Sequence, residues 1–588
     1  MKLQATRTEL IEVAKGIRPA DLYIKGGTII NVYSGEFLKQ NVVIYKDSIA
    51  YIGESEISIG KDTEVVSAEG LYVSPGFIES HNHPWIIYNP ISLAGKMLTL
   101  GTTTIVNDTL LFYLEMGAQG LKEMIKDLKQ LPGTLLWLVR LFSQSGFPGE
   151  REWFNHPEIH SLLDLDEVVG TAEITRWPFV YEADPFLLET IEYAKKLKKV
   201  VDGHASGCSY DKLNSLVAAG LSSCHEAITA KDAFDRLRLG FWTLLRNSSL
   251  RPDLPEVIKF ITEGNVCTSR VIMTNDGPNP SFIEEEGFTA GLVRKAVALG
   301  VPVIQAVQMV TINPATFLRL DDYIGGIAPG RQADLLLLPD LVTFRPEKVF
   351  AKGQIVAIKG ELTAKLPAIN WDKYLVKKPF SFSKSLLEDP DFYRYPHSNE
   401  NESVPVIYSY STVISKREDI ALPSVNGYAD LTNHEDLIFG ALITRDGKWV
   451  SRGILSNFAP RVDGLATTFN TATELLVMGR DPKSMALAAI RVHELGGGIV
   501  LVDGDKVVLE IPLPLTGMMT PSYSFEQAVA YQNALAPAMA ERGYPFHDIL
   551  YSLLFITCDF LPGLRLTPLG LYDVQTHTIL KPAVVLAP

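Results

Sequence analysis

The 588-residue chain has few cysteines, no excess of basic residues and no long apolar run. Its four cysteines are scattered without a C-x-x-C pair, which excludes a disulfide framework and argues against a structural zinc site. The net charge of −14 repels phosphate groups, so we expect neither nucleic acid nor an anionic membrane as a partner. No stretch reaches the roughly 20 apolar residues of a membrane span, and residues 1–16 lack the apolar segment of a secretory signal. These absences predict a cytoplasmic protein.

The chain is too long for one hydrophobic core, and its apolar pattern divides it into about three domains. Residues 1–20 have apolar residues spaced for one face of a helix and are predicted to form an N-terminal helical arm. Residues 21–70 contain short β-rich runs separated by turns, and residues 321–361 contain further runs of this kind. We expect these two segments to combine into one small β-sandwich domain.

Between them, residues 71–320 alternate strand-like and helix-like segments, which is typical of the α/β class with a parallel sheet. The series is long enough to close into a (β/α)8 barrel inserted in the β-sandwich domain. One of its predicted helices covers residues 231–246. Residues 362–405 are rich in proline, serine, lysine and aspartate and are predicted to be a linker. Residues 406–588 are predicted to form a C-terminal α+β domain.

A predicted strand within Pro75-Gly-Phe-Ile-Glu-Ser-His-Asn-His83 ends in two histidines. Residues two apart on a strand point to the same side, so His81 and His83 would project together from its carboxyl end. Catalytic side chains of a (β/α)8 barrel lie at that end of the strands. Two imidazoles on one face can bind a divalent metal ion, although a His-x-His pair alone also occurs in surface loops.

Further polar residues follow four other predicted barrel strands. They are Glu173, His204, the pair His225 and Glu226, and Asp276. Taken singly, each has a structural explanation, such as a turn residue or a solvated strand end. Their recurrence at the ends of apolar strands in one strand–helix series favours a shared site. The chain's seven other histidines lack this context and are predicted to be surface or core residues.

Four histidines, one glutamate and one aspartate can hold two divalent ions about 3.5–4 Å apart. One ion would be bound by His81, His83 and Asp276. The other would be bound by His204 and His225, with Glu173 bridging the two. A hydroxide between the ions would be the nucleophile at neutral pH, and Asp276 would accept its proton.

At these residues the chain resembles the metal-dependent amidohydrolase superfamily, and within it the adenine deaminase family of bacteria. The barrel motifs specify only the superfamily, and they are Pro75–His83, Gly101-Thr-Thr-Thr-Ile-Val106, Val201-Asp-Gly-His-Ala-Ser-Gly207 and Cys224-His-Glu226. The C-terminal domain narrows the resemblance through Gly496-Gly-Gly-Ile-Val-Leu-Val-Asp-Gly504, Ile511-Pro-Leu-Pro-Leu-Thr-Gly517 and Leu564-Arg-Leu-Thr-Pro-Leu-Gly-Leu-Tyr-Asp573. The resemblance therefore spans nearly the whole chain.

Besides a milder change at Glu79, where the family more commonly has aspartate, three segments depart from this family's pattern. Its members usually carry Asp-Pro-His-Glu where this chain has Asn107-Asp-Thr-Leu110. They usually carry His-Asp-Ser-His where the C-terminal domain here has Gly464-Leu-Ala-Thr-Thr-Phe-Asn470. The family's Thr-Asp-Asp is Thr274-Asn-Asp276 here, which leaves the catalytic aspartate on Asp276. The expected metal ligands are kept, whereas groups that would contact a purine or close the site are not.

The resemblance implies hydrolytic deamination of adenine to hypoxanthine and ammonia by a metal-activated hydroxide, with proton transfer by Asp276 or Glu226. It implies two divalent ions, manganese before iron or zinc, although a set of histidines and carboxylates does not choose among these metals. The altered segments leave open a cyclic amide or amidine hydrolase, or a deaminase of another purine-like heterocycle. A non-catalytic scaffold is a further alternative, against which the retained ligand set argues. We expect a small-molecule substrate and a homo-oligomer.

Overall fold

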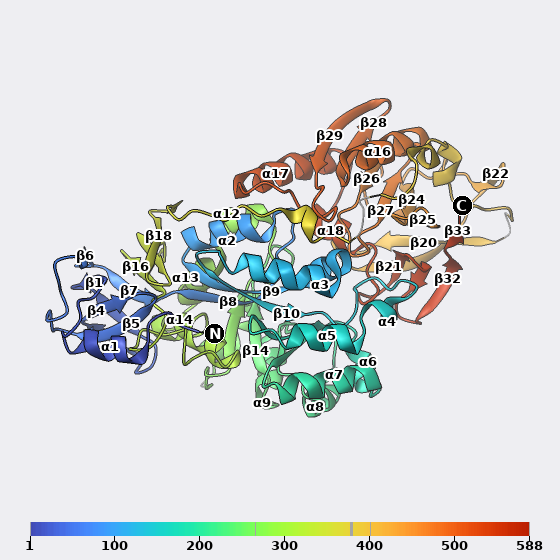
Figure 1. Ribbon diagram of the computed structural model, residues 1–588. Helices are drawn as coiled ribbons and strands as arrows, with labels where there is room; N and C mark the ends of the chain where they lie inside the picture. The colour runs from blue at the N-terminus through green and yellow to red at the C-terminus, as the bar shows by residue number, and fades with distance from the viewer. Residues whose placement is uncertain (1, 265, 377–379, 400–401, 587–588) are drawn as a thin grey trace.

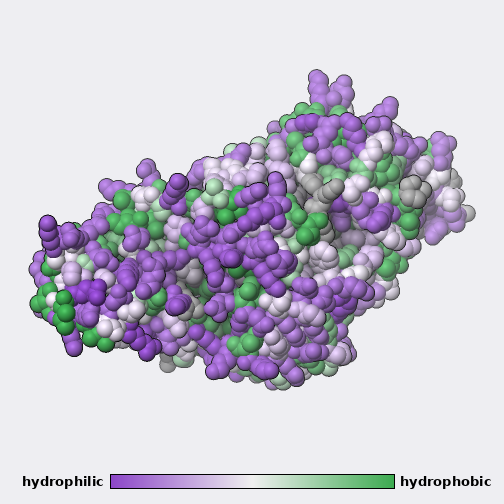
Figure 2. Space-filling view, in the orientation of Figure 1, coloured by the Kyte–Doolittle hydropathy of each residue, from purple (hydrophilic) through white to green (hydrophobic). Residues whose placement is uncertain are grey.

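The computed structural model describes residues 2–264, 266–376, 380–399 and 402–586. A small β domain, a barrel and a C-terminal domain follow one another along the long axis of the molecule (Figure 1). Hydrophilic side chains cover most of the face in Figure 2, with smaller hydrophobic patches between them. Within the described residues, no helix combines the length and apolar character that a membrane span requires.

Eight strands of the described chain form the barrel. The first five make one parallel sheet, and they are β8 (Phe77–Asn82), β9 (Thr102–Asp108), β10 (Thr134–Val139), β11 (Val168–Ile174) and β12 (Val200–Gly203). The other three make a second parallel sheet, and they are β13 (Ser223–Cys224), β14 (Trp242–Arg246) and β15 (Val271–Thr274). The Ser222 N–H donates to the Val201 carbonyl at one seam, and the Thr274 hydroxyl donates to the Glu79 carboxylate at the other (2.6 Å). The predicted (β/α)8 barrel is thus confirmed.

These strands are rich in apolar and small residues because both of their faces are buried. Every residue of β9 and β11 is buried, as is usual for parallel strands covered by helices. Ile78, Val106 and Leu138 belong to one apolar cluster formed by the barrel strands. The helices around them are α2 (Pro90–Thr99), α3 (Leu110–Leu128), α4 (Glu150–Trp153), α5 (His156–Leu163), α6 (Trp177–Tyr181), α7 (Pro185–Lys196), α8 (Tyr210–Ala218), α9 (Ala230–Arg238), α10 (Leu254–Val257), α11 (Lys259–Thr262), α12 (Pro280–Glu286), α13 (Phe288–Ala298), α14 (Val303–Gln308) and α15 (Ile312–Phe317).

The helix predicted over residues 231–246 is wrong in its second half. Helix α9 starts with a capping box at Thr229 and ends at Arg238. Gly240 then takes a left-handed conformation (φ 87°), which suits glycine after a helix. The following residues form strand β14, so Arg246 ends a barrel strand instead of a helix.

The two chain segments on either side of the barrel pair with each other. Strand β7 (Tyr72–Pro75) lies antiparallel to β16 (Leu335–Leu338), with Val73 opposite Leu337. These strands sit in a seven-stranded sheet that packs near a four-stranded sheet, order β5-β4-β1-β6. The remaining strands of this domain are β1 (Leu22–Lys25), β2 (Thr28–Asn31), β3 (Glu36–Lys39), β4 (Asn41–Tyr45), β5 (Ser48–Gly53), β6 (Glu64–Ser67), β17 (Lys348–Ala351), β18 (Gln354–Ile358) and β19 (Glu361–Leu362). The barrel is therefore an insertion in a β-sandwich, and helix α1 (Arg7–Ala14) packs beside β5.

The C-terminal domain is built on a large, mostly antiparallel sheet. Its strands within the described chain are β20 (Ser403–Ser409), β21 (Ser415–Ala421), β24 (Leu437–Ile443), β25 (Trp449–Ser456), β26 (Gly464–Thr467), β27 (Leu475–Gly479), β28 (Gly498–Asp503), β29 (Lys506–Pro512) and β33 (Val584–Val585). Two small sheets, β22 (Ser424–Val425) with β23 (Tyr428–Ala429) and β30 (Leu564–Thr567) with β31 (Gly570–Asp573) and β32 (Thr578–Pro582), complete it. Helix α16 (Pro482–Leu495) covers one face of the large sheet (Figure 1).

The barrel and the C-terminal domain share one apolar core. Helices α17 (Phe525–Glu541) and α18 (Ile549–Phe555) lie on the barrel side of the C-terminal domain (Figure 1). Phe112 of the barrel and Leu553 of α18 belong to the same buried cluster. Because apolar burial dominates association, this shared core fixes the C-terminal domain over the carboxyl ends of the barrel strands.

Candidate metal centre

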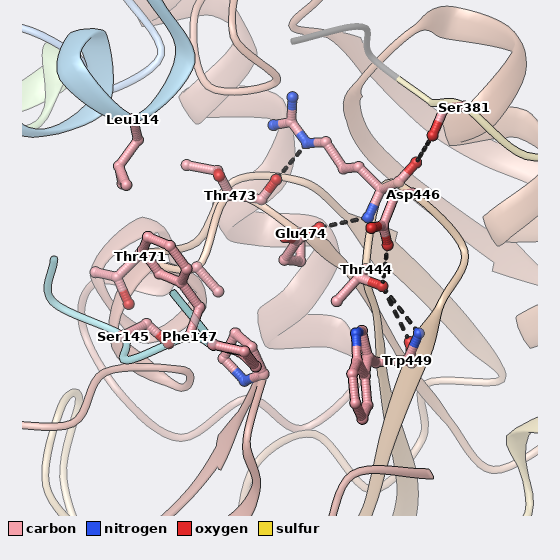
Figure 3. A pocket seen from close by; sticks show the side chains of 14 residues that line it. Leu114, Ser145, Phe147, Ser381, Thr444, Asp446, Trp449, Thr471, Thr473 and Glu474 are labelled. Atoms are coloured by element: carbon pink, nitrogen blue, oxygen red, sulfur yellow. Dashed lines mark hydrogen bonds between the residues drawn. The ribbon is translucent and has the colours of Figure 1, made fainter. Parts of the chain in front are cut away.

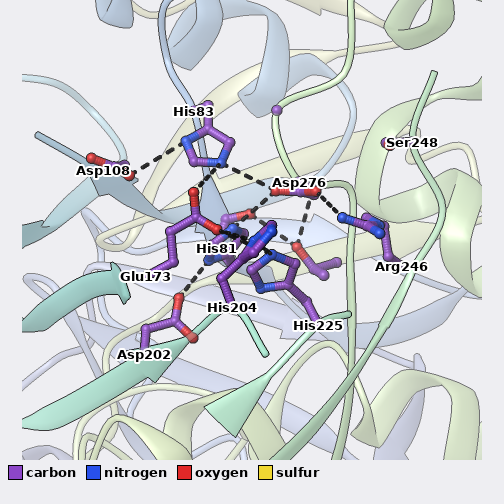
Figure 4. A network of polar contacts seen from close by, with 12 residues as sticks. His81, His83, Asp108, Glu173, Asp202, His204, His225, Arg246, Ser248 and Asp276 are labelled. Atoms are coloured by element: carbon purple, nitrogen blue, oxygen red, sulfur yellow. Dashed lines mark hydrogen bonds and ion pairs between the residues drawn. The ribbon is translucent and has the colours of Figure 1, made fainter. Parts of the chain in front are cut away.

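The structure brings the seven predicted site residues together at the carboxyl ends of the barrel strands. The six proposed metal ligands are labelled in Figure 4. Strand β8 carries His81, and His83 follows it. Strand β11 carries Glu173. The loops directly after β12, β13 and β15 carry His204, the pair His225 and Glu226, and Asp276. Because parallel strands end at one rim of the barrel, residues up to 195 positions apart come into hydrogen-bond distance.

The first group consists of His81, His83 and Asp276. One oxygen of the Asp276 carboxylate, Oδ1, lies 2.9 Å from His81 Nε2 and 3.2 Å from His83 Nε2. The three ligand atoms lie within 4.8 Å of one another. Two imidazole nitrogens and a carboxylate oxygen at this spacing form a set that can hold a divalent ion.

The second group consists of Glu173, His204 and His225. Glu173 Oε2 lies 2.7 Å from His204 Nδ1 and 3.2 Å from His225 Nε2. The other oxygen, Oε1, lies 3.8 Å from His83 Nε2. The Glu173 carboxylate therefore stands between the two groups, where a bridging ligand would have to be.

Charge and donor geometry in this cluster fit divalent cations. His204 Nδ1 and His225 Nε2 lie only 3.1 Å apart, a spacing that lets both nitrogens bind one cation when both are unprotonated. Seven buried charged groups in and around this cluster carry a net charge of −3 when the histidines are neutral. They are Asp108, Glu173, Asp202, Glu226 and Asp276, with Arg140 and Arg246. Buried charge of one sign is costly unless it is paired or binds a metal.

Sequence reasoning missed Asp202, which orients His81. Its Oδ2 lies 2.6 Å from His81 Nδ1, and its Oδ1 accepts a hydrogen bond from the Ser223 hydroxyl (2.6 Å). A carboxylate bound to one ring nitrogen fixes the ring and leaves the other nitrogen for the metal. The signal was present, because Asp202 is a charged residue near the carboxyl end of the apolar strand β12, two residues before His204.

Two further missed residues, Asp108 and Arg140, hold the other edge of the cluster. Arg140 is fully buried, and it donates to Asp108 Oδ2 from Nε (2.6 Å) and to Glu173 Oε1 from Nη2 (2.6 Å). Asp108 lies 3.5 Å from His83 Nδ1. Asp108 falls in the altered segment Asn107–Leu110, so a carboxylate of that segment lies at the edge of the candidate metal centre.

Arg246, missed because β14 was predicted as part of a helix, ties two carboxylates together. Its Nη1 donates to Asp276 Oδ2 (2.8 Å) and also to Glu226 Oε1. Glu226 in turn lies 3.6 Å from His225 and 3.8 Å from His204. The two expected proton-transfer residues thus share one guanidinium group at the cavity side of the cluster.

The carboxylates of the cluster are held in their ionised form. Burial raises the pKa of Asp276, but the charge of His225 and hydrogen bonds from His81 and His83 outweigh it, and the net pKa is well below the usual range. Burial likewise raises the pKa of Glu173, but the charges of His204 and Arg140 outweigh burial, and the net pKa is again well below the usual range. The pKa of Glu226 is lowered because the charge of Arg246 outweighs burial. Ionised carboxylates are the form that binds metal and accepts protons.

A tight turn delivers Asp276 to its place. Asp276 and Gly277 both have left-handed backbone angles, φ 55° and 65°. A Cβ on Gly277 would lie 2.6 Å from the Cβ of His83. Such a conformation in a non-glycine residue is strained and tends to occur at functional sites, and here it allows the chain after β15 to pass directly against His83.

A cavity of about 350 Å³ opens over the cluster, and the C-terminal domain forms its roof. The floor contains five of the predicted residues, which are His83, Glu173, His204, Glu226 and Asp276. The roof residues come from loops and one helix, α18, of the C-terminal domain, and they are Ser411, Thr412, Val413, Ile414, His547, Tyr551, Phe555, Phe560, Leu561 and Pro562. A cavity of this size that joins polar ligands to an apolar wall suits a small molecule.

A second cavity lies farther along the interface between the two domains (Figure 3). It has about 430 Å³ and is lined by residues such as Leu114, Thr471 and Trp449. Its side chains mostly satisfy one another, for example the Thr444 hydroxyl, which donates to Asp446 Oδ1 (2.8 Å). Among the described residues that line it, none belongs to the predicted site. The predicted metal site therefore opens into the smaller cavity.

Comparison with known proteins agrees with the fold. Residues 72–356 match the family described as "Amidohydrolase family", and residues 412–578 match "Adenine deaminase C-terminal domain". A relative from Bacillus cereus is 33% identical over 577 residues, covering 98% of this chain and 96% of the relative. An adenine deaminase from Moorella thermoacetica is 30% identical over 573 residues, covering 96% of each chain.

A capped (β/α)8 barrel with histidines and carboxylates at its rim defines a hydrolase of the amidohydrolase superfamily, which acts on C–N bonds. Within that superfamily, this chain belongs to the adenine deaminase family.

Proposed function

We propose that the protein hydrolyses adenine to hypoxanthine and ammonia. The observation that supports this most is the origin of the cavity roof. Residues 411–414 and 547–562, which cover the metal cluster, lie almost entirely within the segment that matches the adenine deaminase C-terminal domain. The part of the chain that distinguishes this family from other amidohydrolases is therefore the part that faces the substrate.

Two divalent ions fit the arrangement of ligands. His81, His83 and Asp276 would hold one ion, His204 and His225 the other, and the Glu173 carboxylate would bridge them. When bound, such ions lower the pKa of a water molecule and supply a nucleophile at neutral pH. Manganese is the metal we expect first, with iron or zinc as alternatives, because the ligand types accept all three.

Carboxylates of the chain would then transfer the proton during the reaction. Water oxygen adds to C6 of the ring, the C6–N bond breaks, and ammonia leaves. Glu226 lines the cavity in ionised form and is placed to take a proton from the attacking water and return it to the departing amine. Asp276, bound to both His81 and His83, is the alternative acceptor. Arg246 keeps both carboxylates at the cavity side.

The test is a turnover assay on purified, manganese-loaded protein with adenine as substrate and ammonia as the readout. Release of ammonia with formation of hypoxanthine is the expected result. Bound metal without adenine turnover would contradict the substrate assignment, and the same protein would then be assayed on other amino-heterocycles and on cyclic amides.

One observation favours this second class of substrates. Asn107–Leu110 differs from the usual family segment, and its Asp108 accepts a hydrogen bond from Arg140 and lies 3.5 Å from His83 Nδ1. A deaminase of another purine-like heterocycle, or a cyclic amide or amidine hydrolase, would use the same cluster. Assembly as a homo-oligomer stays a prediction, which analytical ultracentrifugation would check.

A further inference from the structure

One loop of the C-terminal domain, residues 557–563, reaches farthest toward the metal centre. Its Phe560 ring lies edge-to-face against the ring of His204, with centroids 5.5 Å apart and planes at 90°. The same ring lies edge-to-face against Phe555, at 5.7 Å. Phe560 thus forms an aromatic surface that begins at a metal-binding histidine and continues into the cavity roof.

Phe560 also separates two cavities. Ser206, Phe560 and Pro562 line the cavity over the metal cluster, and they line a neighbouring cavity of about 500 Å³ as well. This neighbouring cavity of about 500 Å³ extends to Phe179, which is 40% exposed. The ring is therefore the partition between the reaction space and a space that reaches the surface.

The residue before it, Asp559, is tied to the barrel by four hydrogen bonds. Its N–H donates to the Gln144 carbonyl (2.9 Å). Its carboxylate accepts from the Gly146 N–H (2.6 Å), and from Arg176 Nη2 (2.6 Å) and Nε (3.3 Å). The Gln144 side chain donates onward to Glu173 Oε1 (3.1 Å). Gln144 therefore contacts both the 557–563 loop and Glu173, the candidate bridging ligand.

Arg176 makes this anchor strong. Its guanidinium group, with a side chain only 15% exposed, also pairs with Glu150 of the barrel (2.7 Å). Guanidinium–carboxylate pairs are directional as well as strong. A planar network of this kind holds the backbone of residue 559 in one place, and with it the direction of the next side chain.

We propose that Phe560 is the aromatic wall against which the purine ring of the substrate lies, and that Asp559 is the positioning residue that sets this wall over the metal centre. This inference rests on the proposed function, because it specifies how that site recognises a flat heterocycle. Aromatic side chains bind nucleobases by stacking without regard to the pattern of hydrogen bonds. The wall would therefore select for ring shape, while the metal cluster selects the C–N bond that is cleaved.

The wall makes the same contact with the ring before and during the reaction, so it should act on KM and leave kcat unchanged. Adenine kinetics and calorimetric adenine binding are measured on manganese-loaded wild type, Phe560→Leu, Asp559→Asn and the control Phe392→Leu. Phe392 precedes the C-terminal domain and packs partly buried against its apolar core, where it stacks on Arg452, and it does not line the cavity. Phe560→Leu is expected to raise KM and Kd about 10-fold or more, Asp559→Asn to raise both by less, and the control to change neither.

Metal content and melting temperature of each variant separate misfolding from lost recognition. If Asp559→Asn does not fold, Phe560→Leu alone still tests the wall. Equal KM and Kd in Phe560→Leu and Phe392→Leu would overturn the proposal, and so would a fall in kcat at unchanged KM. Wild type that binds adenine without turnover, with binding lost in Phe560→Leu, would refute the proposed function and support the wall. Wild type that neither binds nor converts adenine would refute both.

Discussion

The floor and the roof of the substrate cavity differ in almost every respect. The floor is charged, deeply buried and built from the ends of strands β8, β11, β12, β13 and β15. The roof is largely apolar and aromatic and is built from loops and one helix of another domain. From this difference we propose a division of work, in which rigid strand ends hold the metal ligands and a docked domain provides the shape that selects a substrate.

The largest effect is expected from the floor, on His81→Ala. This change removes one ligand from the first group and leaves Asp202 and Asp276 without their shared imidazole. Ammonia release from adenine should fall to background, and metal content per chain should fall with it. Full activity in this variant would place the chemistry elsewhere and remove the distinction between floor and roof.

Glu226→Gln should separate proton transfer from metal binding. The amide keeps the shape of the side chain but cannot accept a proton, so kcat should fall about 10²–10⁴-fold. Metal content should stay at the wild-type level. A variant that loses metal would show that Glu226 is a ligand, and a variant with normal kcat would assign the proton transfer to Asp276.

Asp202→Asn should weaken the floor without removing a proposed ligand. The His81 ring would lose the carboxylate that fixes its orientation, and changes of this kind typically cost about 10–100-fold in metal affinity or activity. Manganese titration followed by kinetic assay measures both. Asp211→Asn, an exposed aspartate in the first turn of α8, is the matched control and should behave as wild type.

The smallest effect is expected at the anchor of the roof, in Glu150→Gln. Burial raises the pKa of Glu150, but the charge of Arg176 outweighs it, so the folded-state pKa lies below the usual 4.5. A lowered pKa contributes stability that is present above pH 4.5 and is lost as pH falls through the folded-state value. The variant should therefore be less stable at pH 7, by up to about 3 kcal/mol, and the difference in melting temperature from wild type should narrow at acidic pH. A difference that grows on acidification would contradict this.

The sequence allowed most of the floor to be predicted, because strand alternation and strand ends are local patterns. His81 and His83 could be paired from their spacing alone, and Asp276 from its position after an apolar run. Arg246 was missed because a helical pattern was extended past Gly240 into a strand. Arg140 and Asp108 carried no recognisable motif, since a buried ion pair becomes visible only when two strands are placed side by side.

The roof could not be predicted in the same way. Residues 411–414 and 557–563 lie in irregular segments without periodicity, so no repeating pattern marks them. Their role depends on how the C-terminal domain docks on the barrel, which is decided by a shared apolar core and by pairs such as Arg176 with Asp559. The resemblance to a family indicated that this domain matters, and the structure indicates where it acts.

The most direct test of the central claim is the number of manganese ions per chain, measured by elemental analysis after chelation, reloading and dialysis. The arrangement of His81, His83, Glu173, His204, His225 and Asp276 predicts two ions per chain in wild type. It also predicts that ammonia release from adenine is lost on chelation and returns on reloading. A protein that binds no divalent metal under any loading condition, or that deaminates adenine equally well after chelation, would contradict the account.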